Sequence, residues 1–268
     1  VQTIWILSVE KRSWIRKISA ITLGTVIFQG TLGGLTVYYL LPIWISASHG
    51  TIAQTTLCLT VLLTVATSKK WIKQSKENIS PKLFKISLVV TILIWIQLVL
   101  GALMRHSESG LIAFDFPLMN GDLIPTVDKL YDYNQLRNNF IWENIDNSDS
   151  TLTHRHLLDE HLEPITPFKM LIHFAHRFWA LVVFTGITYL FFSIYKFNKN
   201  KHLMKIPVFI LLITAIGQII LGVFSIWSIR DILITTMHVS NGSLVLAISF
   251  YITIWTWRLK LNTYDFNV

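Results

Sequence analysis

The sequence is short of cysteine and of charge. Its 268 residues include one cysteine, Cys58, so no disulfide can form within the chain and no loop is stapled. Charged residues make up 14% of the sequence, whereas typical soluble domains have about a quarter. This composition argues against an ordinary soluble globular protein. It also favours a packing role for Cys58, which lies in an apolar run.

In place of charge, the sequence has six long apolar windows. Apolar residues account for 52% of the chain, and windows of about twenty residues, the length that crosses a hydrocarbon core, recur along it. The windows lie near residues 18–40, 43–67, 83–104, 169–195, 205–228 and 233–257. They predict an all-α membrane protein with six transmembrane helices, rather than six buried helices of a soluble core.

The net charge of +8 is unevenly distributed. Most Lys and Arg residues fall in segments that would share the side of the N-terminus, where only Glu10, Glu77 and Asp265 accompany them. These segments are 1–17, 68–85, 196–205 and 258–268. Because cytoplasmic segments are enriched in Lys and Arg, the pattern predicts a cytoplasmic N-terminus. The positive charge is therefore a topology signal, with no nucleic-acid partner implied.

This topology also predicts the surroundings of the chain. The basic run "SKKWIKQSK" (68–76) is expected to rest on anionic headgroups of the lipid bilayer. The orientation fits the bacterial cell (inner) membrane, and the mitochondrial inner membrane is the alternative.

Two stretches of the sequence align without a gap. "QGTLGGLTVYYLLPIWISASHG" (29–50) and "QIILGVFSIWSIRDILITTMHV" (218–239) share a glutamine, a Leu-Gly pair and a histidine at one constant offset. The aligned residues are Gln29 with Gln218, Leu32-Gly33 with Leu221-Gly222, and His49 with His238, and a third Gln-x-x-Leu-Gly falls at Gln97, Leu100 and Gly101. Internal repeats of membrane proteins place their sites at corresponding positions of the two halves.

The repeat predicts a duplicated pair of four-helix bundles, with eight helices in the full protein. Residues 1–80 would be the remainder of the N-terminal bundle, and residues 81–268 the C-terminal bundle with a long outer loop at 105–168. The same offset places the counterpart of His176 upstream of Val1. We therefore expect about two further helices before this chain. A natural six-helix protein is the alternative.

Three of the nine histidines, His49, His176 and His238, lie near the outer ends of apolar windows. Titratable residues are costly in lipid and usually have a task there. On the logic of the repeat, His176 and His238 face each other across one bundle. Two neutral imidazoles so placed are suited to be axial ligands of a heme iron, with His49 in an equivalent pocket of the other half. Hydrogen-bonded core histidines are the alternative.

Arg177 follows His176 directly and points to a different helical face. We predict that it binds a heme propionate through a bidentate hydrogen-bonded pair, and the alternative is that it extends to the outer headgroups. His173 lies one turn earlier. It could position a propionate or a water, or only mark the interface.

The outer loop at 105–168 is too long to be a plain connector. Its first part, "RHSESGLIAFDFPLMNGDLIP" (105–125), is expected to be ordered, as a lid over the outer membrane face. Arg105, His106 and Glu108 would lie at the mouth of the C-terminal bundle. Four further histidines are His154, His156 and His161, where a metal site competes with a solvated loop, and His202, which we expect to be solvated in the inner basic turn.

With its Gln-x-x-Leu-Gly helices, "HRFWA" at 176–180 and "GALMRHSESGL…FPLMNG" at 101–121, the chain resembles the heme A synthase family. The resemblance implies two similar four-helix bundles, each with a histidine pair near the outer face. His176 and His238 would ligate heme b in the C-terminal bundle, and His49 would be an axial residue for the substrate, heme O.

The resemblance also implies the reaction. A methyl group of heme O is oxidised to a formyl group through successive hydroxylations, which yields heme A for cytochrome oxidase. Heme O synthase and cytochrome oxidase assembly proteins would be partners, and no residue pattern identifies the electron acceptor. Two features depart from the family. The first-bundle partner histidine and the acidic residue before it would lie upstream, and the loop cysteine pairs of many bacterial members are absent.

Two other functions compete with this one. A bis-histidine b-type cytochrome that only passes electrons needs the same ligands, but the repeat argues against it by placing His49 in a second pocket. A transporter would also have repeated helices, but it would need broken helices and charges near the membrane midplane. The candidate polar residues of this chain lie at the outer ends instead.

Overall fold

A computed structural model describes the chain except for residues 74–78, 147–162, 198–201 and 261–268. The described residues form helices joined by loops, and the only strand-like pairing among them is an isolated bridge between Met119 and Asp122.

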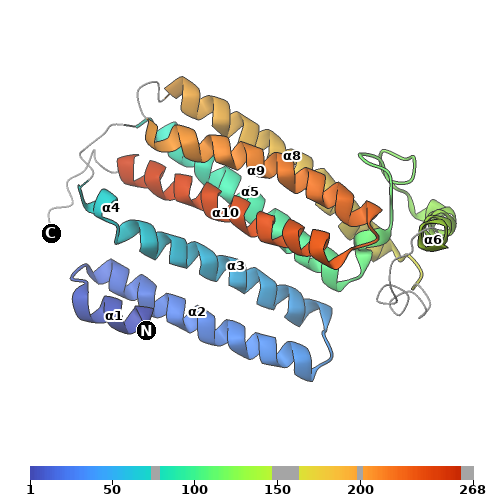
Figure 1. Ribbon diagram of the computed structural model, residues 1–268, viewed down its shortest axis with the longest axis horizontal. Coiled ribbons are helices and arrows are strands. Elements are labelled where there is room, and N and C mark those ends of the chain that lie inside the picture. Colours follow the sequence, from blue (N-terminus) through green and yellow to red (C-terminus); the bar gives the residue numbers. More distant parts are fainter. Residues whose placement is uncertain (74–78, 147–162, 198–201, 261–268) are drawn as a thin grey trace.

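Six long helices form the body of the molecule (Figure 1). They are α2 (Ser13–Tyr38), α3 (Ile43–Ala66), α5 (Pro81–His106), α8 (Pro167–Phe197), α9 (His202–Trp227) and α10 (Ile232–Lys260). All six are long and apolar enough to cross a membrane. The predicted all-α membrane fold with six spans is confirmed, whereas the duplication of bundles remains a prediction.

The helices extend beyond most of the apolar windows, chiefly at the inner ends. α2 begins at Ser13 rather than near residue 18, and α10 ends at Lys260 rather than near 257. About half of the added residues are polar or basic, such as Arg16 and Arg258. Lys and Arg are good helix formers, so the backbone stays helical after the hydropathy has fallen.

The long helices pack as antiparallel neighbours. α2 packs with α3, α5 with α8, and α9 with α10, and the last two pairs form one bundle around a shared core. α3 lies against α5 and α10, and α2 lies outside α3 (Figure 1). Fully buried side chains at the centre of the bundle include Leu83, Ile187, Leu190, Leu211 and Leu246.

Buried hydroxyls join α5 to α10 within the bundle. The Ser87 and Thr256 hydroxyls lie 2.8 Å apart, and Thr91 Oγ1 lies 2.8 Å from Ser249 Oγ and 2.9 Å from Thr253 Oγ1. Apolar packing alone gives little preference between helices in lipid, so hydroxyl pairs of this kind help to specify which helices associate.

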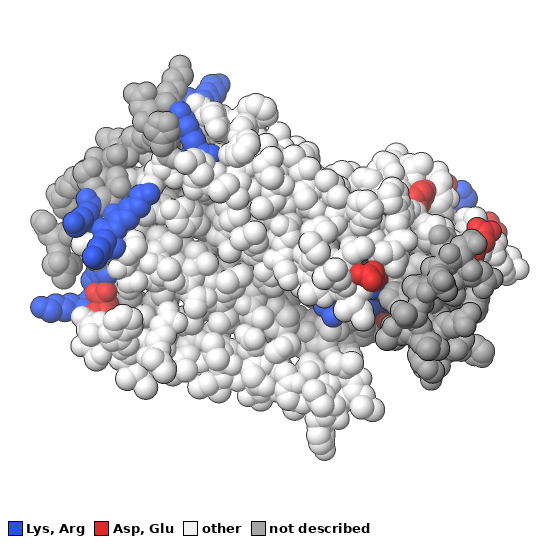
Figure 2. Space-filling view, viewed as in Figure 1, with Lys and Arg blue, Asp and Glu red and all other residues white. Residues whose placement is uncertain are grey.

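Charge separates the two ends of the bundle. Figure 2 shows Lys and Arg gathered at the end where α1 lies and α10 ends, and most of the visible acids at the other end. At the basic end, Trp71 of the short helix α4 (Lys69–Lys73) is buried against Trp255, and Arg258 lies over the Trp71 ring at 5.3 Å. Lys69, Lys70 and Lys73 of α4 are exposed. The arrangement is typical of an inner, headgroup-facing end.

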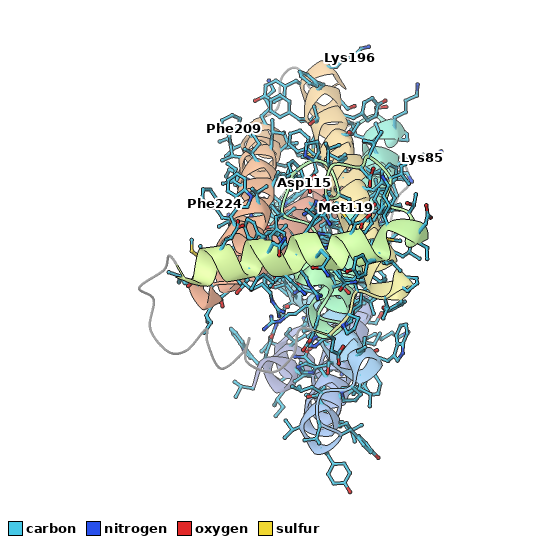
Figure 3. The ribbon with its side chains drawn as sticks, turned by 90° about the vertical axis from the view of Figure 1, so that its right-hand side faces the viewer. Lys85, Asp115, Met119, Lys196, Phe209 and Phe224 are labelled. Atoms are coloured by element: carbon cyan, nitrogen blue, oxygen red, sulfur yellow. The ribbon has the colours of Figure 1, made fainter. Side chains whose placement is uncertain are left out.

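The segment between α5 and α8 covers part of the opposite end. It contains the helix α6 (Leu130–Asp146), which runs across the ends of the spans rather than along them (Figures 1 and 3). Tyr133 of α6 and Met170 of α8 belong to one buried apolar cluster with Ile112, Ala113 and Met119. This end therefore has an ordered cover made of residues 107–146. The remaining short helix, α1 (Gln2–Val9), packs on α2 at the basic end (Figure 1).

Candidate functional site

The three predicted histidines lie in three different spans, near the end opposite the basic one, which the topology predicts to be the outer end. His49 and His238 are each the seventh residue of their helix, α3 and α10, and His176 is the tenth residue of α8. His176 and His238 belong to the same bundle and interact electrostatically. His49 lies on α3, outside that bundle.

Each imidazole lies against a glycine of the antiparallel neighbouring helix. A Cβ atom at Gly33 would come within 3.0 Å of His49 Cε1, one at Gly101 within 3.0 Å of His176 Cε1, and one at Gly222 within 3.1 Å of His238 Cε1. A methyl group at any of these positions would require the imidazole to shift by a few tenths of an ångström. The glycine of each Gln-x-x-Leu-Gly motif is thus the surface on which one imidazole rests.

The glutamine of each motif also reaches its histidine. It lies one turn before the glycine and therefore on the same helical face. Gln97 Nε2 lies 3.3 Å from both ring nitrogens of His176, and Gln218 Nε2 lies 3.3 Å from His238 Nε2. In the third pair, His49 Nδ1 donates to the backbone carbonyl of Gln29 at 2.9 Å.

The Gln97 and Gln218 amides are themselves held in place. Gln97 Nε2 donates to the His176 carbonyl oxygen at 3.0 Å. Asn241 Nδ2 donates to Gln218 Oε1 at 2.8 Å and to the Thr214 carbonyl oxygen at 2.9 Å. The sequence showed the glutamines only as markers of the repeat. The signal that could have identified their role was the recurrence of glutamine and glycine one turn apart in each helix that pairs with a histidine helix.

The surroundings of His238 are compatible with the predicted role of a heme ligand. Metal-bound histidine uses one ring nitrogen for the metal and is oriented through its surroundings. His238 Nδ1 is buried and has no hydrogen-bond partner among the described residues. His238 thus has one ring nitrogen without a partner and a ring in contact with Gln218 and Gly222, an arrangement compatible with an axial ligand.

Arg177 is engaged with the outer cover rather than extended to solvent. Its Nη1 donates to the carbonyl oxygens of Asp115 at 2.7 Å and Leu118 at 2.6 Å, and its Nη2 donates to that of Ala113 at 2.6 Å. The side chain is 8% exposed, so it does not extend to the headgroups. Of its N–H groups, Nε is buried without a partner in the described part of the chain.

These hydrogen bonds limit the number of N–H groups with which Arg177 can make the predicted contact to a propionate. A bidentate pair needs two parallel N–H groups, and three of the five N–H groups of Arg177 already bind carbonyl oxygens. The contact stays a prediction for the two remaining N–H groups, that of Nε and the second one of Nη2.

His173, whose role the sequence left open, is also part of this arrangement. It is 1% exposed, and its Nδ1 donates to the Ser109 carbonyl oxygen at 2.6 Å.

The other predicted polar residues divide into two groups. Arg105 and Glu108 are exposed, and His106 is half-buried at the end of α5, where it interacts electrostatically with His49. His106 therefore lies toward the His49 side. His154, His156 and His161 fall outside the described residues, as does the side chain of His202. Within the described ranges, no group of three His, Cys, Asp or Glu residues could hold a metal ion.

Comparison with known proteins adds two findings. The family model of the cytochrome oxidase assembly proteins (COX15-CtaA) matches residues 1–250. The chain is 26% identical to a heme A synthase of Erythrobacter litoralis over 59% of this chain and 36% of that protein. It is 28% identical to a heme A synthase of Wolbachia pipientis over 67% of this chain and 41% of that protein. The matches thus span about two fifths of the length of these relatives.

Proposed function

The chain belongs to the cytochrome oxidase assembly protein family, and we propose that it forms part of a heme A synthase. In this proposal His176 and His238 hold heme b, and His49 is an axial residue for heme O. The reaction oxidises a methyl group of heme O to a formyl group through successive hydroxylations. We place the protein in a bacterial cell membrane, with both hemes toward the outer face.

The observation that supports the proposal most is the threefold recurrence of one contact. Three histidines on three spans each rest on a motif glycine, and the glutamine one turn earlier reaches the same histidine. Two of the three histidines belong to one bundle, as a bis-histidine heme requires. The third, His49, is the equivalent of His238 in the other half, where a second heme would bind.

Each of the surrounding side chains has a separate role in this proposal. Gln97 and Gln218 orient the His176 and His238 rings. Arg177 offers its two remaining N–H groups, on Nε and Nη2, to a propionate, and the cover made of residues 107–146 shields part of the outer end from water. Oxidation of an unactivated methyl group is beyond side-chain acids and bases, and a bound heme supplies the electron-transfer chemistry.

An electron-transfer cytochrome is the weaker candidate. Such a protein would use His176 and His238 but would have no need of a third imidazole against Gly33. Both relatives are heme A synthases, and the family match does not favour the cytochrome.

The test is the heme content of the full-length protein that carries this chain. It would be purified from cells that make heme O, and its extracted hemes would be identified by chromatography and mass spectrometry. We expect heme B together with hydroxylated or formyl heme. His49→Ala should abolish the oxidised products and retain heme B, whereas His176→Ala and His238→Ala should lose heme B.

His202→Ala, at the first residue of α9 and at the opposite end of the bundle, is the matched control and should change neither. Heme B without any conversion of heme O would support the cytochrome. The absence of any heme would contradict both functions.

A further inference from the structure

We propose that His173 and Arg177 lock the outer segment 109–122 over the His176 and His238 site. The lock consists of hydrogen bonds within the protein. Its consequence for a heme rests on the proposed function.

The lock is built into the same turn of α8 that carries His176. His173 and Arg177 are four residues apart and share a helical face, while His176 faces the Gln97 side. Together the two side chains bind four backbone carbonyls, those of Ser109, Ala113, Asp115 and Leu118. Any shift of the segment relative to α8 therefore breaks several hydrogen bonds near the axial histidine.

The segment is also braced from within and from α9. The Asp115 carboxylate accepts hydrogen bonds from the backbone N–H groups of Asn120 at 2.6 Å and Gly121 at 2.7 Å. Gly121 has a φ of +87°, which a residue with a side chain rarely adopts. Trp227 Nε1 donates to the Phe114 carbonyl oxygen at 3.0 Å. Figure 3 looks onto this end and shows Asp115 and Met119 lying across the ends of the spans.

The chemistry of Arg177 suits a lock better than that of any other cation. A guanidinium has five N–H donors in a rigid, planar fork, whereas a lysine ammonium is a compact point charge on a flexible stem. A lysine ammonium has its three donors on one nitrogen, whereas the three carbonyls are divided between two nitrogens of Arg177, Nη1 and Nη2. Because Arg177 is 8% exposed, water cannot readily replace a lost contact.

The first experiment measures backbone hydrogen exchange of the full-length protein in detergent. Arg177→Lys keeps the charge but removes the fork, and His173→Phe keeps a ring but removes the donor. The N–H groups of Asn120 and Gly121 should exchange about tenfold faster or more in either variant. The segment can then open without first breaking all the hydrogen bonds that His173 and Arg177 make in the native protein. His173→Gln, which retains an N–H donor, should restore slow exchange.

Arg16→Lys, an exposed arginine at the basic end, is the matched control and should leave exchange unchanged. Unaltered exchange of Asn120 and Gly121 in both Arg177→Lys and His173→Phe would overturn the lock. This result does not depend on heme, so it decides the lock even if the proposed function fails.

The second experiment tests what the lock does for the site. Solvent exposure is one determinant of a heme's reduction potential. Opening of the segment should lower the midpoint potential of the bound heme in Arg177→Lys and His173→Phe, and His173→Gln should restore it. Faster exchange with an unchanged potential and unchanged heme content would show that the lock does not serve the heme site.

Discussion

At Gly33, Gly101 and Gly222 the missing side chain is what lets an imidazole lie on the neighbouring helix. Glycine in a helix costs about 1 kcal/mol relative to alanine, so its use at all three positions needs a reason. The reason is steric, because a Cβ atom would come within 3.0 or 3.1 Å of a histidine ring carbon. Other glycines of the same helices, such as Gly34 and Gly217, meet nothing within 4 Å.

Gly222→Ala should therefore weaken heme retention. The added methyl group would push His238 away from the position in which Gln218 holds it. Changes that disturb the orientation of a metal-binding histidine typically weaken binding roughly tenfold to a hundredfold. The heme B content and the absorption spectrum of the purified protein would measure the effect.

Gly217→Ala, on the same helix, provides the comparison and should retain heme fully. Equal heme content in the two variants would show that Gly222 is not the surface on which His238 rests.

At the scale of elements, two sets of polar contacts join neighbouring parts of the fold. Within the bundle, the hydroxyls of α5 and α10 pair across the helix interface. At the outer end, Asp122, Lys129 and Tyr133 join the bridge at Met119 to the start of α6. The hydroxyl contacts lie within the candidate spans α5 and α10, and the contacts of Asp122 lie outside the spans.

Thr91→Val should destabilise the packing of α5 on α10. Thr91 Oγ1 contacts both Ser249 and Thr253, and valine has nearly the same shape without a hydroxyl. Interhelical hydrogen bonds in membranes contribute about 1 kcal/mol, so the unfolding midpoint in detergent should fall. Thr185→Val, whose hydroxyl bonds only within α8, should have little effect. A fall of the same size in both variants would mean that the interhelical bonds contribute nothing.

The outer end should respond to acid through Asp122. The hydrogen bond from Lys129 Nζ at 2.7 Å and then that from Tyr133 at 2.6 Å hold the pKa of Asp122 below its usual value. A lowered pKa means that the carboxylate stabilises the fold above the unfolded pKa, and that this contribution is lost as the pH falls through the folded pKa.

Titration of the Asp122 carboxyl by ¹³C NMR should thus give a midpoint below the usual value of about 4. Tyr133→Phe should raise this midpoint, because one of the two hydrogen bonds is lost. A midpoint at the usual value in the unmodified protein would contradict the contact.

At the scale of the whole molecule, α3 connects the outlying helices to the bundle. It packs on both α5 and α10. Gln54 Nε2 of α3 donates to Ser243 Oγ of α10 at 2.8 Å, and these residues are separated by 189 positions, the offset of the repeat. Equivalent positions of two repeats meet where a pseudo-two-fold axis passes between them. This contact supports the proposed duplication.

The orientation of the molecule can be tested with its single cysteine replaced. In a Cys58→Ser background, Ile124→Cys and Ile72→Cys form a matched pair, since the two isoleucines are 65% and 62% exposed. An impermeant maleimide added to intact cells should label Ile124→Cys only, because Ile72 lies at the basic end. Both should be labelled after permeabilisation. Labelling of Ile72→Cys alone would mean that the orientation is reversed.

The sequence by itself determined the membrane spans and the three candidate histidines. Each span can be recognised from consecutive residues, because it is a run of apolar residues between charged ends. The histidines stand out because a titratable side chain is costly in such a run. The Gln-x-x-Leu-Gly repeat also identified the three helices against which these histidines lie. Only the tertiary structure decided what these side chains touch, since Gln97 and His176 are 79 residues apart.

The partners of Arg177 and His173 show most clearly why the rest could not be predicted. Both side chains bind backbone carbonyls 59 to 64 residues away. Every residue has a carbonyl, so these acceptors leave no mark on the sequence, whereas a heme propionate was the natural partner to predict for a buried arginine. The fold determines which carbonyls face α8, and so it alone decided that Arg177 holds the outer segment.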